Sequence, residues 1–132
     1  MRYLLDTNIV SFLLRKHAAV ARRVVSTPLS DLRISAITEA ELRYGVAKRP
    51  EATRLNRAIS EFLVRIDTVA WNSAASSRYG VLRSDTERQG KTLAPLDLLI
   101  AAHALSLDVV LVSNDPVFAN VTGLMLEDWT RP

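Results

Sequence analysis

Four acidic residues stand in stretches where a folded chain ordinarily buries apolar side chains: Asp6, Glu41, Asp97 and Asp115. Asp6 ends the apolar run that starts the sequence, and Asp115 closely follows the run Val109–Val112. Asp97 interrupts an apolar segment, and Glu41 falls on the apolar stripe of a predicted helix. A desolvated carboxylate is costly unless it is paired or holds a cation. Because no lysine partner lies within these segments, we predict that folding gathers the four carboxylates into a shared metal site.

The chemistry of such a site follows from its ligands. Carboxylates packed within about 4 to 5 Å repel by roughly 1 to 4 kcal/mol per pair, and a divalent cation removes that penalty. A set of oxygen ligands without imidazole or thiolate favours Mg²⁺ or Mn²⁺ over zinc. Such sites serve phosphoryl chemistry, in which metal ions activate water and stabilise the leaving oxygen. The sequence therefore predicts a metal-dependent enzyme that acts on phosphate esters.

Three of the acidic residues also have structural alternatives, which the sequence leaves open. Asp6 could be a turn residue, and Asp97 could cap or charge the start of its helix. Asp115 precedes Pro116 and could be a plain N-cap. Glu41 has no routine structural role on an apolar helical stripe. Polar neighbours could orient the carboxylates from a second layer; these are Thr7, Asn8, Ser113 and Asn114.

Short apolar strands that alternate with helices must position these residues. The predicted strands are residues 2–6, 32–35, 66–69, 109–112 and 124–126. The predicted helices are residues 8–15, 18–26, 38–49, 51–64, 72–89 and 95–107, with a helical turn at 116–120. This order predicts one α/β domain over residues 1–132, an α/β/α sandwich with a central, mostly parallel sheet of four to five short strands.

The predicted topology favours convergence of the acidic residues. Ligands of open α/β folds gather beyond the carboxyl ends of the strands, where Asp6 and Asp115 fall. Asp97 lies in the first turn of its helix, where the helix dipole favours an anion. The stripe that contains Glu41 and Tyr44 is predicted to face the sheet. We therefore expect all four carboxylates at one edge of the sheet.

Composition bounds the function further. The 132 residues are 48% hydrophobic and 23% charged, as in an ordinary globular protein. The absence of cysteine excludes disulfides, zinc thiolate sites and thiol catalysis, and the four glycines form no Gly-rich phosphate loop. No apolar run has the length of a signal peptide or a membrane span. A cytoplasmic protein without membrane contact is expected.

Positive charge is concentrated in the first half of the chain. Residues 1–65 contain twelve Lys and Arg against six Asp and Glu, whereas residues 66–132 contain five against eight. If the four carboxylates bind metal, the other side chains carry a balance of +7. This balance suits a polyanionic partner such as nucleic acid. An arginine-rich composition without functional meaning is the open alternative.

Taken together, these motifs resemble the PIN-domain ribonucleases, and more narrowly the VapC toxins of bacterial toxin–antitoxin modules. The motifs that carry the resemblance are LLDTN at 4–8, SAITEAELRYG at 35–45, PLDLLIAAHA at 95–104, VSND at 112–115 with Phe118, and GLMLEDW at 123–129. Their order and separation extend the resemblance over essentially the whole chain. It implies a PIN-domain fold.

The resemblance also implies a function. It identifies Asp6, Glu41, Asp97 and Asp115 as the acidic quartet of a Mg²⁺- or Mn²⁺-dependent endoribonuclease. It implies a homodimer and a cognate VapB antitoxin, whose C-terminal segment enters the acidic pocket. Relatives often cut tRNA, and this chain resembles those that act on initiator tRNA. Our hypothesis places Asp6, Glu41 and Asp97 around one ion, and Asp115 with Asp6 or Asp97 around a second.

Two functions of other kinds remain open. One is a non-catalytic interaction module whose acidic pocket receives a basic peptide. The other is a DNase on the same scaffold. His103, six residues past Asp97, is predicted to be a satisfied or interface histidine, and Trp71 and Trp129 are predicted to pack in the core or at its edge.

Overall fold

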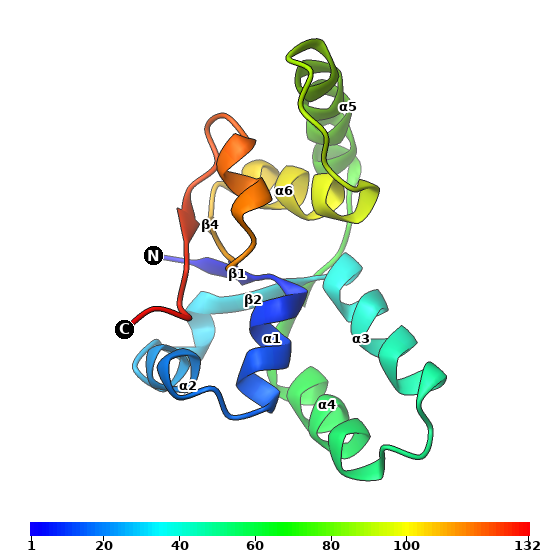
Figure 1. The fold of residues 1–132 in the computed structure, drawn as a ribbon, viewed down its shortest axis with the longest axis vertical. Coiled ribbons are helices and arrows are strands. Elements are labelled where there is room, and N and C mark those ends of the chain that lie inside the picture. Colours follow the sequence, from blue (N-terminus) through cyan, green and yellow to red (C-terminus); the bar gives the residue numbers. More distant parts are fainter.

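A five-stranded parallel sheet forms the centre of the computed structural model, which describes all 132 residues (Figure 1). The strands are β1 (Tyr3–Leu5), β2 (Leu32–Ser35), β3 (Asp67–Val69), β4 (Val110–Val112) and β5 (Leu126–Glu127). The α-helices are α1 (Thr7–Leu14), α2 (Ala18–Val25), α3 (Ala36–Lys48), α4 (Thr53–Arg65), α5 (Ser73–Arg88) and α6 (Pro95–Leu107). Two short 3-10 helices span Leu29–Asp31 and Pro116–Asn120. The predicted α/β/α architecture is confirmed, with five strands that all run parallel.

The strand order is β3-β2-β1-β4-β5. From β1 the chain builds outward through β2 and β3, and it then crosses to the other side for β4 and β5. The order therefore reverses between β1 and β4, and this reversal opens a crevice beyond their carboxyl ends. The two strand ends are joined directly, because the Asp6 backbone N–H donates to the Val112 carbonyl at 2.9 Å.

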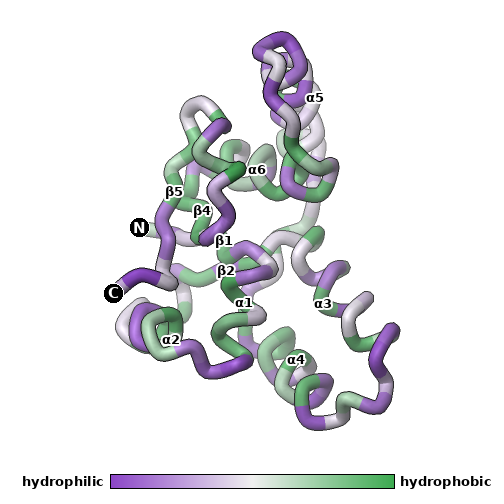
Figure 2. Tube along the Cα trace, viewed as in Figure 1, coloured by the Kyte–Doolittle hydropathy of each residue, from purple (hydrophilic) through white to green (hydrophobic).

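Apolar side chains cover both faces of the sheet. Successive residues of a strand point to opposite faces, and the buried pair Leu4 and Leu5 accordingly enters two different clusters. Leu4 packs with α5 and α6, whereas Leu5 packs with α1, α2 and α4. Figure 1 shows these two groups of helices on opposite sides of the strands, and Figure 2 shows the hydrophobic centre between them. Trp129 is fully buried in the second cluster, as predicted.

Helices α3 and α4 form a hairpin that extends beside α1 (Figure 1). The prediction that the Glu41–Tyr44 stripe of α3 faces the sheet is wrong. Thr38 and Leu42 are the buried residues of this helix, and Tyr44 is 65% exposed. Helical periodicity identifies a stripe but not what lies opposite to it. Here Ala40, Tyr44 and Ala47 of the stripe are exposed, whereas Glu41 contacts Thr7 of α1.

One strand differs from its predicted position. The last strand is Leu126–Glu127 instead of 124–126. Gly123 adopts a φ of +83°, a left-handed conformation that glycine allows, and the resulting turn delays the strand. None of the helices is both long and apolar enough to cross a lipid bilayer.

Candidate active site

Asp6 is the most enclosed of the four predicted carboxylates. It is 5% exposed, and its oxygens accept hydrogen bonds from the Thr7 backbone N–H and the Ser113 hydroxyl, each at 2.8 Å. Burial raises the pKa of Asp6 from 3.8 to about 6; the two hydrogen bonds oppose this rise, and the charges of Asp97 and Glu41 add to it. Asp6 is also the N-cap of α1, a structural role that differs from the turn residue considered from the sequence. The raised pKa means that burying the Asp6 carboxylate is electrostatically costly. A capping role alone does not explain why the chain buries it.

Asp97 lies in the first turn of α6 without capping it. The N-cap of this helix is Ala94, Pro95 opens it, and no side chain caps it. Burial raises the pKa of Asp97, and the charges of Asp115 and Glu41 raise it further. The helix dipole offers some compensation at this position. Of the alternative that Asp97 caps or charges its helix start, the capping role is therefore wrong, whereas Asp97 does place an acidic charge in the first turn.

Glu41 reaches the crevice from α3, the helix that follows β2. Its Oε1 accepts a hydrogen bond of 2.7 Å from the Thr7 hydroxyl, which belongs to the first turn of α1. The Thr38 hydroxyl, one turn before Glu41, lies 3.3 Å from the same hydroxyl of Thr7. The Thr7 hydroxyl thus connects the Glu41 carboxylate of α3 to the first turn of α1.

Asp115 follows β4 and caps the 3-10 helix after it. Its Oδ1 accepts a hydrogen bond of 3.0 Å from the Val117 N–H, so the predicted N-cap role is confirmed. The Ser113 hydroxyl donates to Asp6 and accepts from the Asp115 N–H at 3.1 Å. Ser113 therefore links the two carboxylates that end β1 and β4.

The second layer predicted from the sequence is only partly assembled. Thr7 and Ser113 contact the carboxylates, as described above. Asn8 is exposed on α1 and takes no part in the hydrogen-bond network. Asn114 contributes a buried Oδ1 that has no hydrogen-bond partner, although it stands next to Asp115 in the chain.

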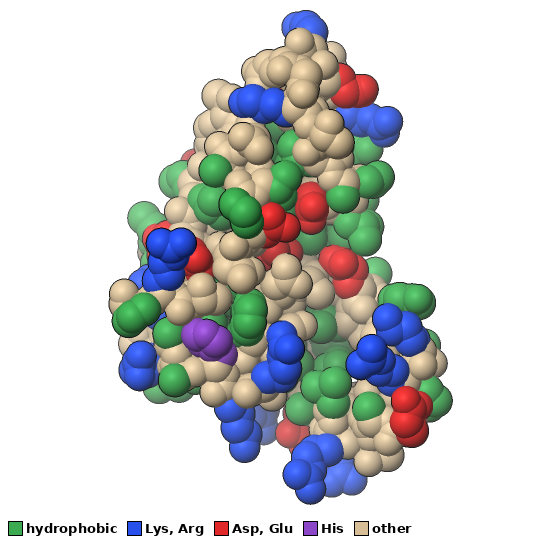
Figure 3. All heavy atoms as spheres, viewed as in Figure 1, with side chains coloured by type: hydrophobic (Ala, Val, Ile, Leu, Met, Phe, Trp, Pro, Cys, Tyr) green, Lys and Arg blue, Asp and Glu red, His purple; other side chains and the backbone are tan.

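The crevice holds uncompensated negative charge. None of the ion pairs in the structure involves Asp6, Glu41, Asp97 or Asp115. The four carboxylates are nevertheless close together, because the charges of Asp97 and Glu41 raise the pKa of Asp6 and those of Asp115 and Glu41 raise the pKa of Asp97. Figure 3 shows acidic side chains gathered near the middle of one face, with Lys and Arg over its lower part. A hard divalent cation fits this donor set and charge.

The four side chains are gathered but not arranged around one point. No three acidic or histidine side chains stand close enough to share a single ion in this conformation. Mutual repulsion favours this separation in the absence of a cation.

His103 is not part of the acidic crevice. It is 1% exposed, and its Nδ1 lies 2.7 Å from the Ser35 hydroxyl at the end of β2. Its ring packs edge-on against Trp71, with the ring centres 5.2 Å apart. Burial lowers the pKa of His103, and the Ala70 backbone opposes this shift. The prediction of a satisfied histidine is confirmed for Nδ1 only, because the buried Nε2 has no hydrogen-bond partner.

Sequence reasoning missed Thr38 and the basic groove beyond Glu41. The signal for Thr38 was its position one turn before Glu41, on the same side of the helix. The groove contains Lys48 and Arg49, whose charges were counted in the total but not placed.

The comparisons with known proteins agree with this geometry. The PIN domain family model matches residues 3–124. A relative from Shigella flexneri named tRNA(fMet)-specific endonuclease VapC is 34% identical over 98% of this chain and 99% of its own length. Ribonuclease VapC2 of Rickettsia felis is 32% identical, over 99% of this chain and all of its own length.

Solved structures give the same result for the fold. The crystal structure of DNA-bound VapBC from Salmonella typhimurium contains a chain with a TM-score of 0.91 and 30% identity, covering 98% of both chains. VapBC2 from Rickettsia felis, bound to a promoter DNA fragment, contains one with a TM-score of 0.89 and 32% identity, covering 98% of this chain and 99% of that one. This chain belongs to the PIN-domain family, within its VapC branch.

Proposed function

We propose that this protein is a metal-dependent endoribonuclease and the toxin of a VapBC-type toxin–antitoxin pair. The observation that carries the proposal is the uncompensated cluster of four carboxylates at the reversal point of the sheet. Full-length relatives named as VapC ribonucleases support the reaction class. The enzyme hydrolyses phosphodiester bonds in RNA.

The metal assignment follows the charges. Once their side chains turn toward one ion, Asp6, Glu41 and Asp97 would hold one Mg²⁺ or Mn²⁺, and Asp115 with Asp6 or Asp97 would hold a second. When bound, the metal supplies a Lewis acid that activates water and neutralises charge on the phosphate. Two observations support a cation at this place. The pKa values of Asp6 and Asp97 are raised, and the buried side-chain Oδ1 of Asn114 has no hydrogen-bond partner.

The protein's own contribution is to hold the carboxylates ionised and oriented. The hydrogen bonds that Asp6 accepts from Ser113 and Thr7 favour its charged form. The Thr7 hydroxyl directs the Glu41 carboxylate from the neighbouring helix. These contacts fix rotamers that substrate binding would otherwise have to order, which is the usual function of groups behind metal ligands.

The substrate and partners follow from the relatives. We propose tRNA as the RNA class and initiator tRNA as the specific target, because the Shigella flexneri and Salmonella typhimurium relatives are named tRNA(fMet)-specific. A VapB-type antitoxin is the proposed inhibitor, since an acidic pocket is a natural receptor for an arginine or lysine side chain. The proposed assembly is a homodimer, and the proposed compartment is the cytoplasm.

The test replaces one carboxylate and leaves its helix intact. Asp97→Asn is expected to abolish cleavage of tRNA in the presence of Mg²⁺ while the protein remains folded. Asp108→Asn is the matched control, because Asp108 is exposed at the other end of α6 in a left-handed conformation that asparagine tolerates. Undiminished cleavage by Asp97→Asn would contradict the assignment.

The same assay separates the alternatives. Equal amounts of labelled RNA and DNA, offered together, distinguish a ribonuclease from a DNase on this scaffold. EDTA is expected to stop cleavage of the RNA. A protein that never cuts either polymer and keeps its partner affinity in EDTA would instead be an interaction module.

A further inference from the structure

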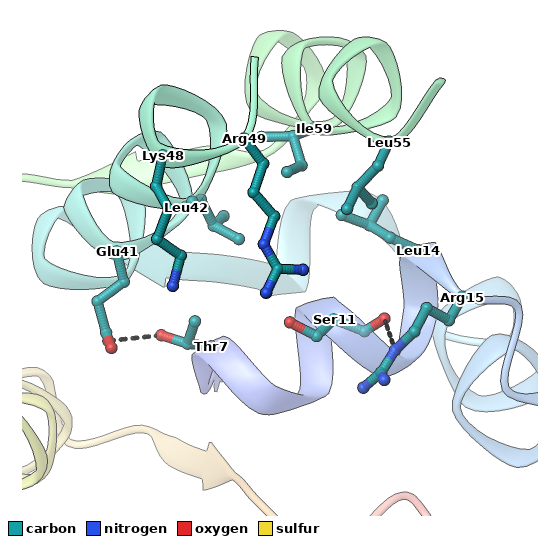
Figure 4. A pocket seen from close by; sticks show the side chains of 11 residues that line it. Thr7, Ser11, Leu14, Arg15, Glu41, Leu42, Lys48, Arg49, Leu55 and Ile59 are labelled. Carbon is teal, nitrogen blue, oxygen red and sulfur yellow. Dashed lines mark hydrogen bonds between the residues drawn. The ribbon is translucent and has the colours of Figure 1, made fainter. Parts of the chain in front are cut away.

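A groove of about 380 Å³ leads away from the acidic crevice between α1, α3 and α4. It begins at Thr7 and Glu41, which belong to the crevice, and its floor includes Leu42 and Ile59. Three basic side chains also line it. Figure 4 shows Lys48 and Arg49 extending from α3 into the space that faces α1, with Arg15 on the opposite side. We call this feature the cationic groove.

The basic side chains of the cationic groove are not neutralised by the protein. Arg15, Lys48 and Arg49 are exposed, and none of them takes part in an ion pair. Lys48 instead places its Nζ 5.1 Å from the ring centre of the exposed Tyr44. The Arg15 Nε donates to the Ser11 carbonyl at 3.3 Å. These cations are available to an anionic ligand.

Gly45 lines the groove from the middle of α3. A glycine inside a helix lowers its stability relative to alanine, so it usually has a reason. Neither conformation nor packing gives one here, because its φ is not positive and a Cβ at this position would meet nothing within 4 Å. The missing side chain leaves open the path between Glu41 and Lys48.

We propose that the cationic groove binds the RNA strand next to the scissile phosphate, with Lys48 and Arg49 as phosphate contacts. The inference rests on the proposed function, because it extends the same substrate from the acidic crevice. Arg15 completes the basic end from α1, and Tyr44 beside Lys48 presents an exposed aromatic face for a base. Basic grooves with aromatic faces are the usual means of binding single-stranded nucleic acid.

The spacing along α3 suits a polynucleotide. Glu41 and Lys48 lie seven residues apart on one side of the helix, which is about 10 Å of helical rise. Stacked nucleotides rise by about 3.4 Å each, so this distance corresponds to roughly three nucleotides. The carboxylates at the acidic end of the groove would repel an RNA strand. The basic side chains of the groove offset that repulsion on the nucleotides next to the cleaved bond.

A peptide is the competing occupant, because the floor of the groove is apolar. The basic end argues against it. A peptide inhibitor that inserts a basic side chain into the acidic crevice would have to supply an acidic segment for Arg15, Lys48 and Arg49 as well. The phosphate groups of an RNA strand can contact both the basic side chains and a metal in the crevice. One repeating group therefore suits both ends of the groove once a metal is bound.

The experiment measures RNA binding in an Asp97→Asn background, in which bound RNA is not cut and the loss of one charge lowers the repulsion of the acidic crevice without a bound ion. The probes are a short fluorescein-labelled single-stranded RNA and, separately, bulk tRNA. Lys48→Gln/Arg49→Gln is expected to weaken binding about tenfold and to reduce the slope of log affinity against log salt by about 1.4, or 0.7 per lost phosphate contact. The control Arg54→Gln/Arg57→Gln removes two exposed charges from α4 outside the groove. It is expected to change neither value.

Blocking the groove tests the same idea without a change of charge. Gly45→Leu fills the path and is expected to weaken RNA binding at least tenfold. Gly80→Leu is its control, because Gly80 also lies inside a helix, α5, where an added Cβ would meet nothing within 4 Å. Circular dichroism before and after heating verifies that both variants fold.

The outcomes separate this inference from the proposed function. Equal affinity of the two double variants, or full RNA affinity of Gly45→Leu, would overturn the groove assignment. So would groove variants that keep RNA affinity and lose only the co-expressed antitoxin. Failure of the proposed function itself has a different signature, namely cleavage of RNA by Asp97→Asn.

Discussion

The Ser113 hydroxyl donates a 2.8 Å hydrogen bond to Oδ2 of Asp6, joining residues 107 positions apart. Ser113 follows β4 and Asp6 follows β1, so the bond spans the point at which the strand order reverses. It is the strongest influence that lowers the pKa of Asp6 against the effect of burial. The bond therefore stabilises the charged form of a carboxylate that burial would otherwise neutralise.

Ser113→Ala removes this donor and should raise the pKa of Asp6 above its value of about 6. Cleavage at neutral pH is expected to fall and to recover partly at higher pH, because the charged carboxylate is the metal-binding form. The loss also leaves the Asp115 N–H without its acceptor, at a cost of about 1 to 3 kcal/mol in unfolding free energy. A pH–rate profile and urea unfolding measure the two effects.

Ser106→Ala is the matched control for that experiment. The Ser106 hydroxyl donates to the His103 carbonyl within α6, away from the carboxylates. It should leave the pH–rate profile unchanged. If the pH–rate profiles of Ser113→Ala and Ser106→Ala coincide, Ser113 does not influence the ionisation of Asp6.

The metal-free protein should lose stability as pH rises from about 4 to 6. Asp6 has a pKa of about 6 in the folded chain against 3.8 ordinarily, so the folded state retains this proton after the unfolded state has lost it. The free energy of unfolding then falls by roughly 2 to 3 kcal/mol through this interval and levels off above it. Urea unfolding in EDTA at several pH values measures the change. Asp6→Asn should remove most of it, and an identical pH dependence in that variant would refute the assignment.

Much of this fold could be predicted from the sequence because local signals agree with the tertiary structure. Pro95 at the first helical position fixed the start of α6, and the strand predicted at 32–35, where Leu32 and Ile34 alternate with polar residues, coincides with β2. The side of α3 that faces inward could not be predicted. Its apolar residues do not form one face, and the exposure of Tyr44 depends on where α1 and α4 lie.

The candidate site could also be predicted only in part from the sequence. Acidic residues at strand ends could be placed by topology alone, because parallel strands end at one edge. Their hydrogen-bond partners required coordinates, since Thr7 meets Glu41 and Thr38 across two helices. The cationic groove was also beyond the sequence, because it depends on how α1, α3 and α4 lie relative to one another.

Mg²⁺ should stabilise the protein through the carboxylates. A ligand that binds only the folded state at one hundred times its dissociation constant stabilises it by about 2.7 kcal/mol. We expect the melting temperature to rise with Mg²⁺ concentration in the unmodified protein and in Asp108→Asn. Asp97→Asn should have a much smaller response and a higher starting value, because repulsion with Asp115 and Glu41 is relieved. Equal Mg²⁺ responses in all three proteins would place the ion elsewhere.

The Thr7 hydroxyl offers a test of orientation that is separate from charge. Thr7→Val keeps the shape of the side chain but removes the 2.7 Å hydrogen bond to Glu41. Thr7→Ser keeps the hydroxyl and loses only a methyl group. We expect Thr7→Val to lower kcat about ten- to a hundredfold, the range found when groups behind metal ligands are lost, and Thr7→Ser to retain most of it. Cleavage rates at saturating Mg²⁺ measure the difference. Because both variants preserve the four carboxylates, a loss shared equally by both would point to packing at the start of α1 instead of to the direction of Glu41.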